Sequence, residues 1–224
     1  MMDVLRGGLQ GVLVAALLLS SGSLQAEAKM SESAALLAEQ LDALGQLHAQ
    51  FEQRRFDARG IELQRSRGQF WAERPDRFRW EVDEPFAEVL IGDGETLWLW
   101  DPDLEQVTIR PYDERLRSTP ASLLSGGVDD LLDDFRVRHD DEGERLSFQL
   151  EPHATDALFE RLELVFDAGS LRWLVIHDGM GQYTEVGLRS ARTEFAQDDG
   201  RYQFVIPEGV DVLREPAQSG LPDG

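Results

Sequence analysis

The sequence from position 77 to 82 reads Arg77-Phe78-Arg79-Trp80-Glu81-Val82, in which charged and large apolar side chains alternate. Successive side chains of an extended chain point to opposite faces, so the two aromatic rings and Val82 share one face. The charged side chains share the other. This period of two predicts a β-strand with one face toward a core and the other toward water.

Segments of the same kind continue on both sides of this strand. We expect further strands at residues 49–56, 61–72, 87–91, 95–100, 104–110, 135–139, 145–151, 159–166, 171–177, 182–195 and 201–206. Turn sequences rich in Asp, Pro and Gly separate them, such as Arg74-Pro75-Asp76, Gly92-Asp93-Gly94 and Asp101-Pro102-Asp103. Connections this short join antiparallel hairpins and leave no room for crossover helices. The pattern predicts a meandering antiparallel sheet.

Two parts of the chain have a helical pattern instead. Between Ser31 and Gln53, apolar positions recur at spacings of four, three, four and three, namely Leu37, Leu41, Leu44, His48 and Phe51. This predicts an amphipathic helix with His48 on its apolar face. Farther along, Ser118-Thr119-Pro120 predicts the start of a short helix over 121–124, which Gly126-Gly127 ends, and 129–134 form a second helical turn. Two helices of this size fit the role of a cover over one opening of a curved sheet.

The segment 95–100 is apolar on both faces. Thr96, Trp98 and Trp100 share one face, and Leu97 and Leu99 share the other. Such a strand cannot have one side in water, so either a helix covers one face or one face lines a dry space. About eleven strands curled round a helix enclose more room than side chains fill, which predicts a cavity for apolar cargo.

The amino terminus has the features of a secretory signal. Arg6 gives a positive start, and eight consecutive apolar residues follow from Val12 to Leu19, well short of the ~20 that span a bilayer. Small residues then offer cleavage after Ala26 or Ala28. We therefore expect 1–28 to be a cleaved signal peptide, 29–213 to be one domain, and 214–224 to be a flexible polar tail.

The composition narrows the function classes. The formal net charge is −21, from 22 Lys+Arg against 43 Asp+Glu, so we expect no nucleic-acid partner. The absence of cysteine excludes disulfides, thiolate metal sites and cysteine nucleophiles. The four histidines are scattered, and no nucleophile elbow, phosphate-binding loop or H-E-x-x-H motif is present. We predict no catalytic residue, no metal, no cofactor and no enzyme activity.

The large negative net charge has two possible explanations. The protein belongs to a salt-adapted host, or the charge keeps the protein away from anionic lipid head groups.

Five segments resemble one known family. Residues 68–80 (GQFWAERPDRFRW) and 89–102 (VLIGDGETLWLWDP), with Pro85 between them, closely resemble LolA, the periplasmic carrier of outer-membrane lipoproteins. Residues 48–53 are similar to the place where its first helix runs into its first strand, 119–124 to the opening of its lid, and 204–210 to its closing strand. Since the order and spacing of these motifs also agree, the resemblance covers most of 34–212.

The resemblance implies an α+β fold that is mainly β: an incomplete antiparallel β-barrel, wrapped round an amino-terminal helix and closed by a short helical lid. It also implies site residues. These are Arg74, which would hold the lid shut by hydrogen bonds to lid carbonyls, the cavity residues Phe78, Trp80 and Leu90, and the apolar lid residues Leu123 and Leu124.

The implied function is that of a periplasmic chaperone, which we expect to be a monomer. It would take the acyl chains of lipoproteins from the inner-membrane LolCDE complex and deliver them to LolB, the outer-membrane receptor. LolB shares the fold but needs a lipidated cysteine, which this chain lacks. Two alternatives remain open: a LolA-like carrier or sensor of another lipid, such as a glycolipid, and an envelope protein-interaction module that never holds lipid.

Overall fold

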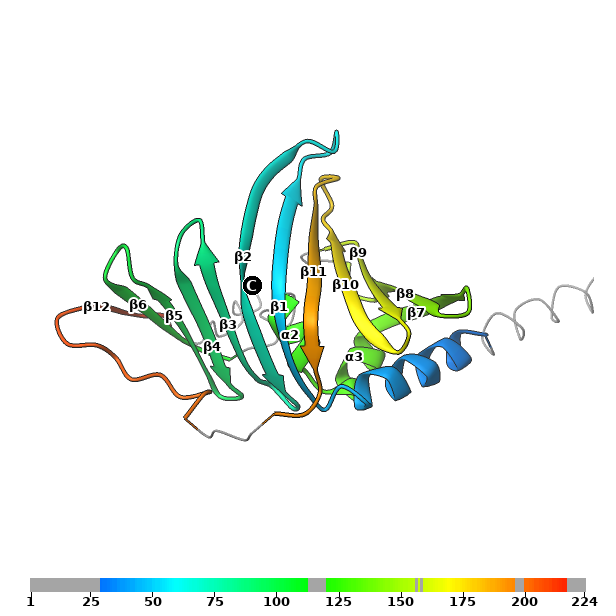
Figure 1. The fold of residues 1–224 in the computed structure, drawn as a ribbon, viewed down its shortest axis with the longest axis horizontal. Coiled ribbons are helices and arrows are strands. Elements are labelled where there is room, and N and C mark those ends of the chain that lie inside the picture. Colours follow the sequence, from blue (N-terminus) through cyan, green and yellow to red (C-terminus); the bar gives the residue numbers. More distant parts are fainter. Residues whose placement is uncertain (1–28, 113–119, 156, 158, 196–199, 217–224) are drawn as a thin grey trace, which may run out of the picture.

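A computed structural model describes residues 29–112, 120–155, 157, 159–195 and 200–216. The predicted signal segment and most of the predicted tail therefore lie outside the described residues. The main element is one twelve-stranded sheet with the order β12-β6-β5-β4-β3-β2-β1-β11-β10-β9-β8-β7 (Figure 1). Its strands are β1 (Gln46–Phe56), β2 (Glu62–Glu73), β3 (Arg77–Glu84), β4 (Glu88–Asp93), β5 (Thr96–Asp101), β6 (Gln106–Pro111), β7 (Phe135–Asp141), β8 (Arg145–Pro152), β9 (Arg161–Asp167), β10 (Ser170–His177), β11 (Tyr183–Arg192) and β12 (Asp211–Arg214).

The sheet confirms the predicted fold class. All neighbouring strands pair antiparallel except β12, which pairs parallel with β6. The edge strands are β12 and β7, so the curved sheet stays open and forms an incomplete barrel. Most of the predicted strands recur within a few residues of their expected bounds, because alternation and turn chemistry are local signals.

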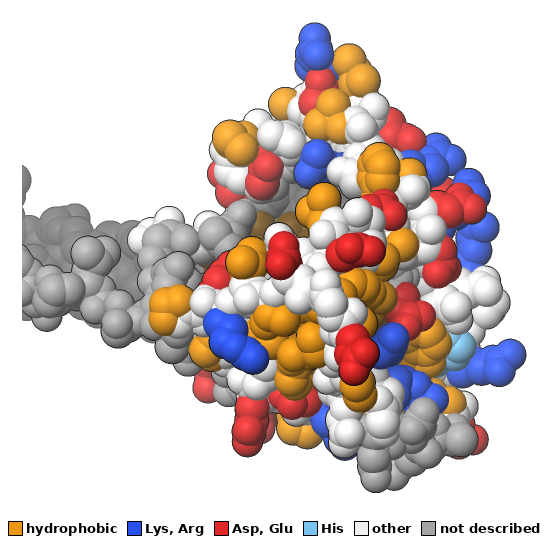
Figure 2. All heavy atoms as spheres, turned by 90° about the vertical axis from the view of Figure 1, so that its left-hand side faces the viewer, with side chains coloured by type: hydrophobic (Ala, Val, Ile, Leu, Met, Phe, Trp, Pro, Cys, Tyr) orange, Lys and Arg blue, Asp and Glu red, His pale blue; other side chains and the backbone are white. Residues whose placement is uncertain are grey.

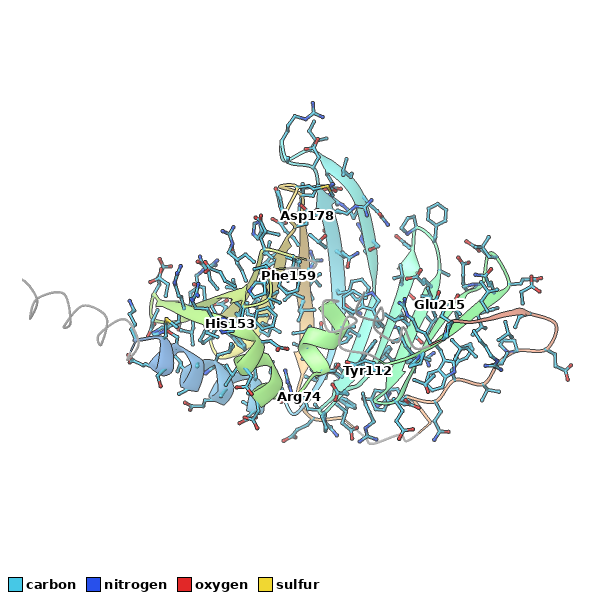
Figure 3. All side chains as sticks on the ribbon, turned by 180° about the vertical axis from the view of Figure 1, so that it is seen from behind. Arg74, Tyr112, His153, Phe159, Asp178 and Glu215 are labelled. Atoms are coloured by element: carbon cyan, nitrogen blue, oxygen red, sulfur yellow. The ribbon has the colours of Figure 1, made fainter. Side chains whose placement is uncertain are left out.

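Three helical segments lie on the concave face of this sheet (Figures 1 and 3). They are residues 29–42, α2 (Pro120–Ser125) and α3 (Val128–Asp134). Leu37 and Leu41 are fully buried and share one hydrophobic core with Phe70, Phe78 and Phe148 of the strands. None of the described helices has the length and hydropathy needed to cross a membrane.

The amino-terminal helix is shorter than its sequence pattern predicts. Helical residues end at 42, and β1 starts at Gln46, so the predicted helix through Gln53 is wrong from residue 43 onward. From Leu47 onward the buried residues alternate, with Leu47, Ala49 and Phe51 at 3% exposure or less. His48 therefore lies on the convex face of β1 rather than on an apolar helix face. The spacing from Leu44 to Phe51 fits a helix but covers only two turns, whereas Leu47, Ala49 and Phe51 have the period of two that the structure follows.

The predicted strand at 201–206 is also wrong, and so is a closing strand within 204–210. The structure has turns and irregular backbone there, and the last strand is β12. Tyr202 is 3% exposed, and Phe204 lies near Trp100, with ring centroids 6.3 Å apart. The alternating aromatic residues of this segment pack on side chains of the convex face, while its backbone stays outside the ladder.

This packing explains why β5 is apolar on both faces. Trp98 and Trp100 pair with Ile109 and Val107 of β6 on the convex face, where Ile91 and Val107 are completely buried. Leu97 on the concave face belongs to the main core. Both faces of β5 are therefore shielded, one by the core and the other by the segment that links β11 to β12.

Candidate functional site

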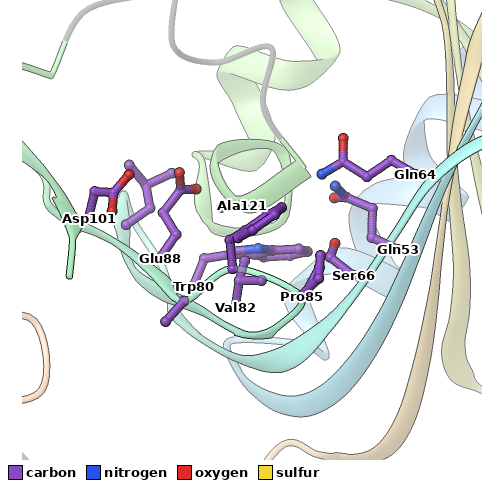
Figure 4. Close-up of a pocket in the computed structure, with 12 residues that line it drawn as sticks. Gln53, Gln64, Ser66, Trp80, Val82, Pro85, Glu88, Asp101 and Ala121 are labelled. Atoms are coloured by element: carbon purple, nitrogen blue, oxygen red, sulfur yellow. The ribbon is translucent and has the colours of Figure 1, made fainter. Parts of the chain in front are cut away.

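A pocket of about 310 Å³ lies on the concave face of β1–β5, under α2 (Figure 4). Its walls are a mixture of apolar and polar side chains. They come from Gln53, Gln64, Ser66, Trp80, Val82, Pro85, Phe86, Ala87, Glu88, Leu90, Asp101 and Ala121. Phe86, in the turn between β3 and β4, is 72% exposed, so the pocket reaches the surface at this turn.

The apolar part of the wall centres on Trp80. Its ring is stacked against Phe51, with centroids 3.9 Å apart, and lies 5.3 Å from the ring of Phe70. Leu90 pairs with Trp80 across β3 and β4, so the two side chains lie next to each other on the concave face. Alternation and resemblance thus pointed to two residues that line the pocket.

Phe78, the third predicted cavity residue, lies deeper in the core. It is 1% exposed and does not belong to the residues that line this pocket. Its ring packs against the backbone of Gly92, where an added Cβ would lie 2.6 Å from Phe78 Cε1. The ring of Tyr112 is 6.3 Å away. Phe78 lies on the same face of β3 as Trp80, but its ring is in the core beneath the pocket rather than on the pocket wall.

The turn between β2 and β3 is hydrogen-bonded to the carboxyl-terminal end of α2. Arg74 Nη1 donates to the carbonyl of Gly126, and the backbone N–H of Asp76 donates to the carbonyl of Ser125 over 2.8 Å. Carbonyls at a helix end have no partner within the helix, so this turn satisfies two of them. We call these two hydrogen bonds the latch.

The guanidinium of Arg74 is largely buried and incompletely paired. Burial lowers the pKa of Arg74 to about 10, against the opposing influence of the Asp42 and Asp76 carboxylates, so the group stays charged at neutral pH. Nε and Nη2 have no hydrogen-bond partner among the described residues. One hydrogen bond therefore joins this charged group to the end of α2.

The lid predictions fall on α2. Leu124 is 2% exposed and belongs to the main core, and Ala121 closes the pocket from above. The side chain of Leu123 lies outside the described residues. Ala121 had no signal of its own in the sequence, because an alanine in a six-residue helix contacts a pocket only through the placement of the helix.

The sequence also did not identify the polar pocket residues. Gln53 lies directly opposite Ser66 across β1 and β2, and the pairing of Val89 with Trp100 brings Glu88 and Asp101 next to each other. Burial raises the pKa of Glu88, and the charge of Asp101 raises it further. Strand register decides these neighbours, and register is not readable from one strand alone.

Within the described part of the chain, no three His, Asp or Glu side chains converge as metal ligands would. His48 stacks on Trp71, with ring centroids 4.7 Å apart. Both rings lie on the convex face, whereas the pocket lies on the concave face. The other histidines lie on β7, on β10 and after β8, outside the pocket wall.

Comparison with known proteins gives the family. The model of the family described as outer membrane lipoprotein carrier protein LolA matches residues 42–205. The outer-membrane lipoprotein carrier protein of Chromohalobacter salexigens is 40% identical over 179 residues, which cover 80% of this chain and 85% of that protein. The protein of the same name from Azotobacter vinelandii is 38% identical over 179 residues, 80% of this chain and 86% of that one. The crystal structure of a LolA superfamily protein from Nitrosomonas europaea aligns at TM-score 0.47 and 10% identity, over 76% of this chain and 98% of that chain. The chain therefore belongs to the LolA family of outer-membrane lipoprotein carrier proteins.

Proposed function

We propose that this protein is a periplasmic lipoprotein carrier. It takes lipoproteins from the inner-membrane LolCDE complex, shields their acyl chains in the space between the sheet and α2, and delivers them to LolB. The observation that carries this proposal is the pocket with Trp80 and Leu90 on its wall, closed by a helix that the latch holds in place. Family membership and the names of the relatives support the same function.

The physical need for such a carrier is large. Each methylene that leaves water is stabilised by ~0.8 kcal/mol, so an anchor with several acyl chains cannot cross an aqueous compartment unshielded. The pocket of about 310 Å³ is roughly twice the ~150 Å³ of an apolar cavity that holds one benzene. It has room for part of one acyl chain. Loading of a whole anchor therefore requires α2 to move away from the sheet.

The latch sets the cost of that movement. A hydrogen bond from a charged group contributes about 1.5–3 kcal/mol and one from a backbone N–H about 1 kcal/mol. Burial of about three to five methylenes offsets that sum. An acyl chain thus supplies enough free energy to open the latch, and the closed latch lowers the affinity for cargo. A receptor without such a cost then binds the same chains better, which gives the transfer its direction.

The test is Arg74→Leu. Without the guanidinium the closed state is weaker and cargo binds more tightly, so this variant should load lipoproteins from spheroplasts as well as the wild type does. It should fail to pass them to LolB. Loading is measured as soluble complex released from spheroplasts, and transfer as lipoprotein recovered with purified LolB.

The matched control is Arg59→Leu, which removes an arginine paired with Asp57 in the exposed turn after β1. It should load and transfer normally. Normal transfer by Arg74→Leu would contradict the role of the latch. Native mass spectrometry of protein purified from the periplasm identifies the cargo: bound lipoprotein supports the proposal, whereas a glycolipid alone, or no lipid at all, favours one of the two alternatives.

A further inference from the structure

An exposed tryptophan lies on the convex face of the sheet, opposite to the face that carries the pocket. Trp173 of β10 is 41% exposed, and its ring lies against the backbone of Gly187 on β11, where an added Cβ would be 2.5 Å from Trp173 Cζ3. Leu171, which belongs to the core, opposes Phe166 of β9. Trp173, two residues later, opposes the adjacent Val165, so β10 has one extra residue here. This bulge turns the Trp173 ring outward instead of into the core.

A second bulge places two arginines on the same face, next to this ring. Gln50 and His48 of β1 are two positions apart and oppose Arg189 and Arg192 of β11, which are three positions apart. In between, Ser190 has a φ of +53°, which residues other than glycine rarely adopt. Without the extra residue, Arg189 and Arg192 would point to opposite faces of the sheet. Bulges are frequent next to functional sites, where they redirect side chains.

These two arginines have no carboxylate partner, although the chain has 43 Asp+Glu for 22 Lys+Arg. Neither Arg189 nor Arg192 forms a salt bridge with a described Asp or Glu, including Glu194. Other arginines of the convex face are paired, namely Arg54 with Glu185 over 2.6 Å and Arg67 with Glu52 over 3.4 Å. With acidic residues in twofold excess, two neighbouring arginines without a partner indicate that another molecule supplies the carboxylates.

A third arginine adds to the positive charge. The guanidinium carbon of Arg201 lies 5.9 Å from the centroid of the Trp71 ring, which stacks on His48. The charges of Arg192 and Arg201 both lower the pKa of His48, so the two guanidinium groups act on the same spot. We call Trp173, Arg189, Arg192 and Arg201 the arginine patch.

The arginine patch borders a groove of about 450 Å³ that crosses β1 and β2. Arg189, Gln50 and Gln69 line its near side, on three neighbouring strands. Its far side has the carboxylates of Glu52, Asp83 and Glu84, of which the first and the last contact Arg67 over 3.4 and 3.7 Å. The side-chain amides next to Arg189 both donate and accept hydrogen bonds, as the backbone of a bound peptide requires.

We propose that the arginine patch binds an acidic segment of a partner protein. The ring of Trp173 and the guanidinium groups of Arg189 and Arg192 follow one another along β11 at about two-residue spacing, roughly 7 Å per step. An extended segment with an apolar residue followed by acidic residues two and four positions later presents all three side chains on one face. The carboxylates pair with the two arginines, and the apolar side chain contacts Trp173. Tryptophan and arginine are the residue types that most often dominate the binding energy of an interface.

The rest of the molecule favours a protein segment over a membrane. An anionic membrane is an extended surface, which a protein of net charge −21 meets with many of its carboxylates at once. A short peptide meets only the charges within a Debye length, ~8 Å at physiological salt. The arginine patch lies on the face opposite to the pocket, so a bound partner leaves the pocket accessible. This inference is independent of the proposed carrier function.

The experiment follows individual tryptophans by fluorine NMR after labelling all five with fluorotryptophan. The probe is the peptide LTETE with acetylated and amidated ends, and its uncharged counterpart is LTQTQ. Trp173→Phe and Trp80→Phe assign two resonances. LTETE should shift the Trp173 resonance in a saturable manner and leave that of Trp80, on the pocket wall, unchanged. LTQTQ should shift neither, and 500 mM sodium chloride should abolish the effect of LTETE, because it shortens the Debye length to less than ~8 Å.

Two charge variants locate the binding site. Arg189→Gln with Arg192→Gln should weaken the binding of LTETE on the order of tenfold, since two exposed charge pairs are lost. The matched control is Arg136→Gln with Arg138→Gln, which changes the net charge equally on β7, where both arginines already contact Glu151 over 3.5 and 3.3 Å. The control should bind LTETE as the wild type does. The fluorine spectrum without peptide verifies that each variant is folded.

Three results of the titrations would overturn the inference: equal binding of LTETE and LTQTQ, an equal effect of the two double variants, or a shift of the Trp80 resonance in place of Trp173. The membrane is tested with vesicles of equal parts phosphatidylcholine and phosphatidylglycerol, which should not sediment the protein. Sedimentation that Arg189→Gln with Arg192→Gln abolishes would assign the arginine patch to a lipid surface instead. Protein that binds LTETE but loads no lipoprotein retains this inference and refutes only the carrier function.

Discussion

Phe78 and Trp80 lie two residues apart on one strand face and yet meet different surroundings. Trp80 has one side on Phe51 and another on the pocket, whereas Phe78 fills the space above Gly92. A side chain at position 92 would occupy the place of the Phe78 ring. The glycine is thus part of the core that supports the pocket.

Gly92→Ala should therefore destabilise the protein. The new Cβ would lie 2.6 Å from a ring that is 1% exposed and cannot move away, which costs about 1–3 kcal/mol. The matched control is Gly187→Ala, whose Cβ would lie 2.5 Å from Trp173, a ring that is 41% exposed and free to swing. Urea unfolding measures both. Equal decreases in the free energy of unfolding for the two variants would show that the mobility of the neighbouring ring does not decide the destabilisation. Adding Phe78→Leu to Gly92→Ala should restore part of the lost stability.

His48 makes stability depend on pH. Burial lowers the pKa of His48, and the charges of Arg192 and Arg201 lower it further, although Gln69 opposes them. Below about pH 6.5 the unfolded chain binds a proton that the folded protein resists, so the free energy of unfolding falls as the pH falls from about 6.5 to the lower pKa of the folded state. His48→Phe keeps the ring against Trp71 and should reduce this loss.

Urea unfolding at pH 7 and pH 5 checks the His48 prediction. The variant should lose less stability than the wild type between these two values. His153→Gln, at an exposed position after β8, is the control and should behave as the wild type does. If His48→Phe loses as much stability between pH 7 and pH 5 as the wild type does, other titratable groups cause the loss.

At the scale of elements, the decisive contact joins the β2–β3 turn to α2. The helix has six residues and is too short to be stable by itself, so its position depends on Leu124 in the core and on the latch. The strands beneath it are held by continuous ladders. We therefore expect a displacement of α2 to leave the sheet intact.

A disulfide across the latch should block loading. Asp76 N lies 2.8 Å from Ser125 O, so the two backbones are close enough for a disulfide, and the chain has no other cysteine to interfere. Oxidised Asp76→Cys with Ser125→Cys should release no lipoprotein from spheroplasts, and reduction should restore release. Asp76→Cys alone serves as the control. Loading by the oxidised variant would mean that cargo enters without movement of α2.

At the scale of the whole molecule, charge is the dominant feature. The formal net charge is −21, and acidic side chains alternate with apolar and basic ones around the β12 edge (Figure 2). Val205, Val212 and Leu213 are among the exposed apolar residues of the last described segment. Such a net charge opposes compaction by self-repulsion and also keeps the protein apart from anionic surfaces.

Salt should therefore stabilise the protein. Raising sodium chloride from 10 mM to 500 mM shortens the Debye length from ~30 Å to less than 8 Å and screens the repulsion between carboxylates. We expect the Tm to rise by a few degrees, since ~1 kcal/mol corresponds to about 2–4 °C for a chain of this size. Thermal unfolding measures it, and potassium chloride should act alike. A fall in Tm would mean that ion pairs such as Arg54 with Glu185 outweigh the repulsion.

The amino-acid sequence by itself determined β1 to β11, their antiparallel order and the two short helices, because alternation, turn residues and helix ends act within a few residues; it did not predict β12, which pairs parallel with β6. It also directed attention to Arg74, Trp80 and Leu90, which the structure places at the β2–β3 turn and on the pocket wall, while their roles stay predictions. Whether two strand positions are an even number of residues apart tells which side chains share a face, but not which other residues cover that face. The sequence therefore placed Phe78 in the same cavity as Trp80.

Tertiary structure decided the rest. Strand register brought Gln53 opposite Ser66 and Glu88 beside Asp101, and these pairs come from different strands. The packing of Tyr202 and Phe204 on the convex face replaced a strand that their alternation had predicted. Contacts of this kind depend on segments far apart in the chain, and the free energy that selects them belongs to the whole folded sheet rather than to any one segment.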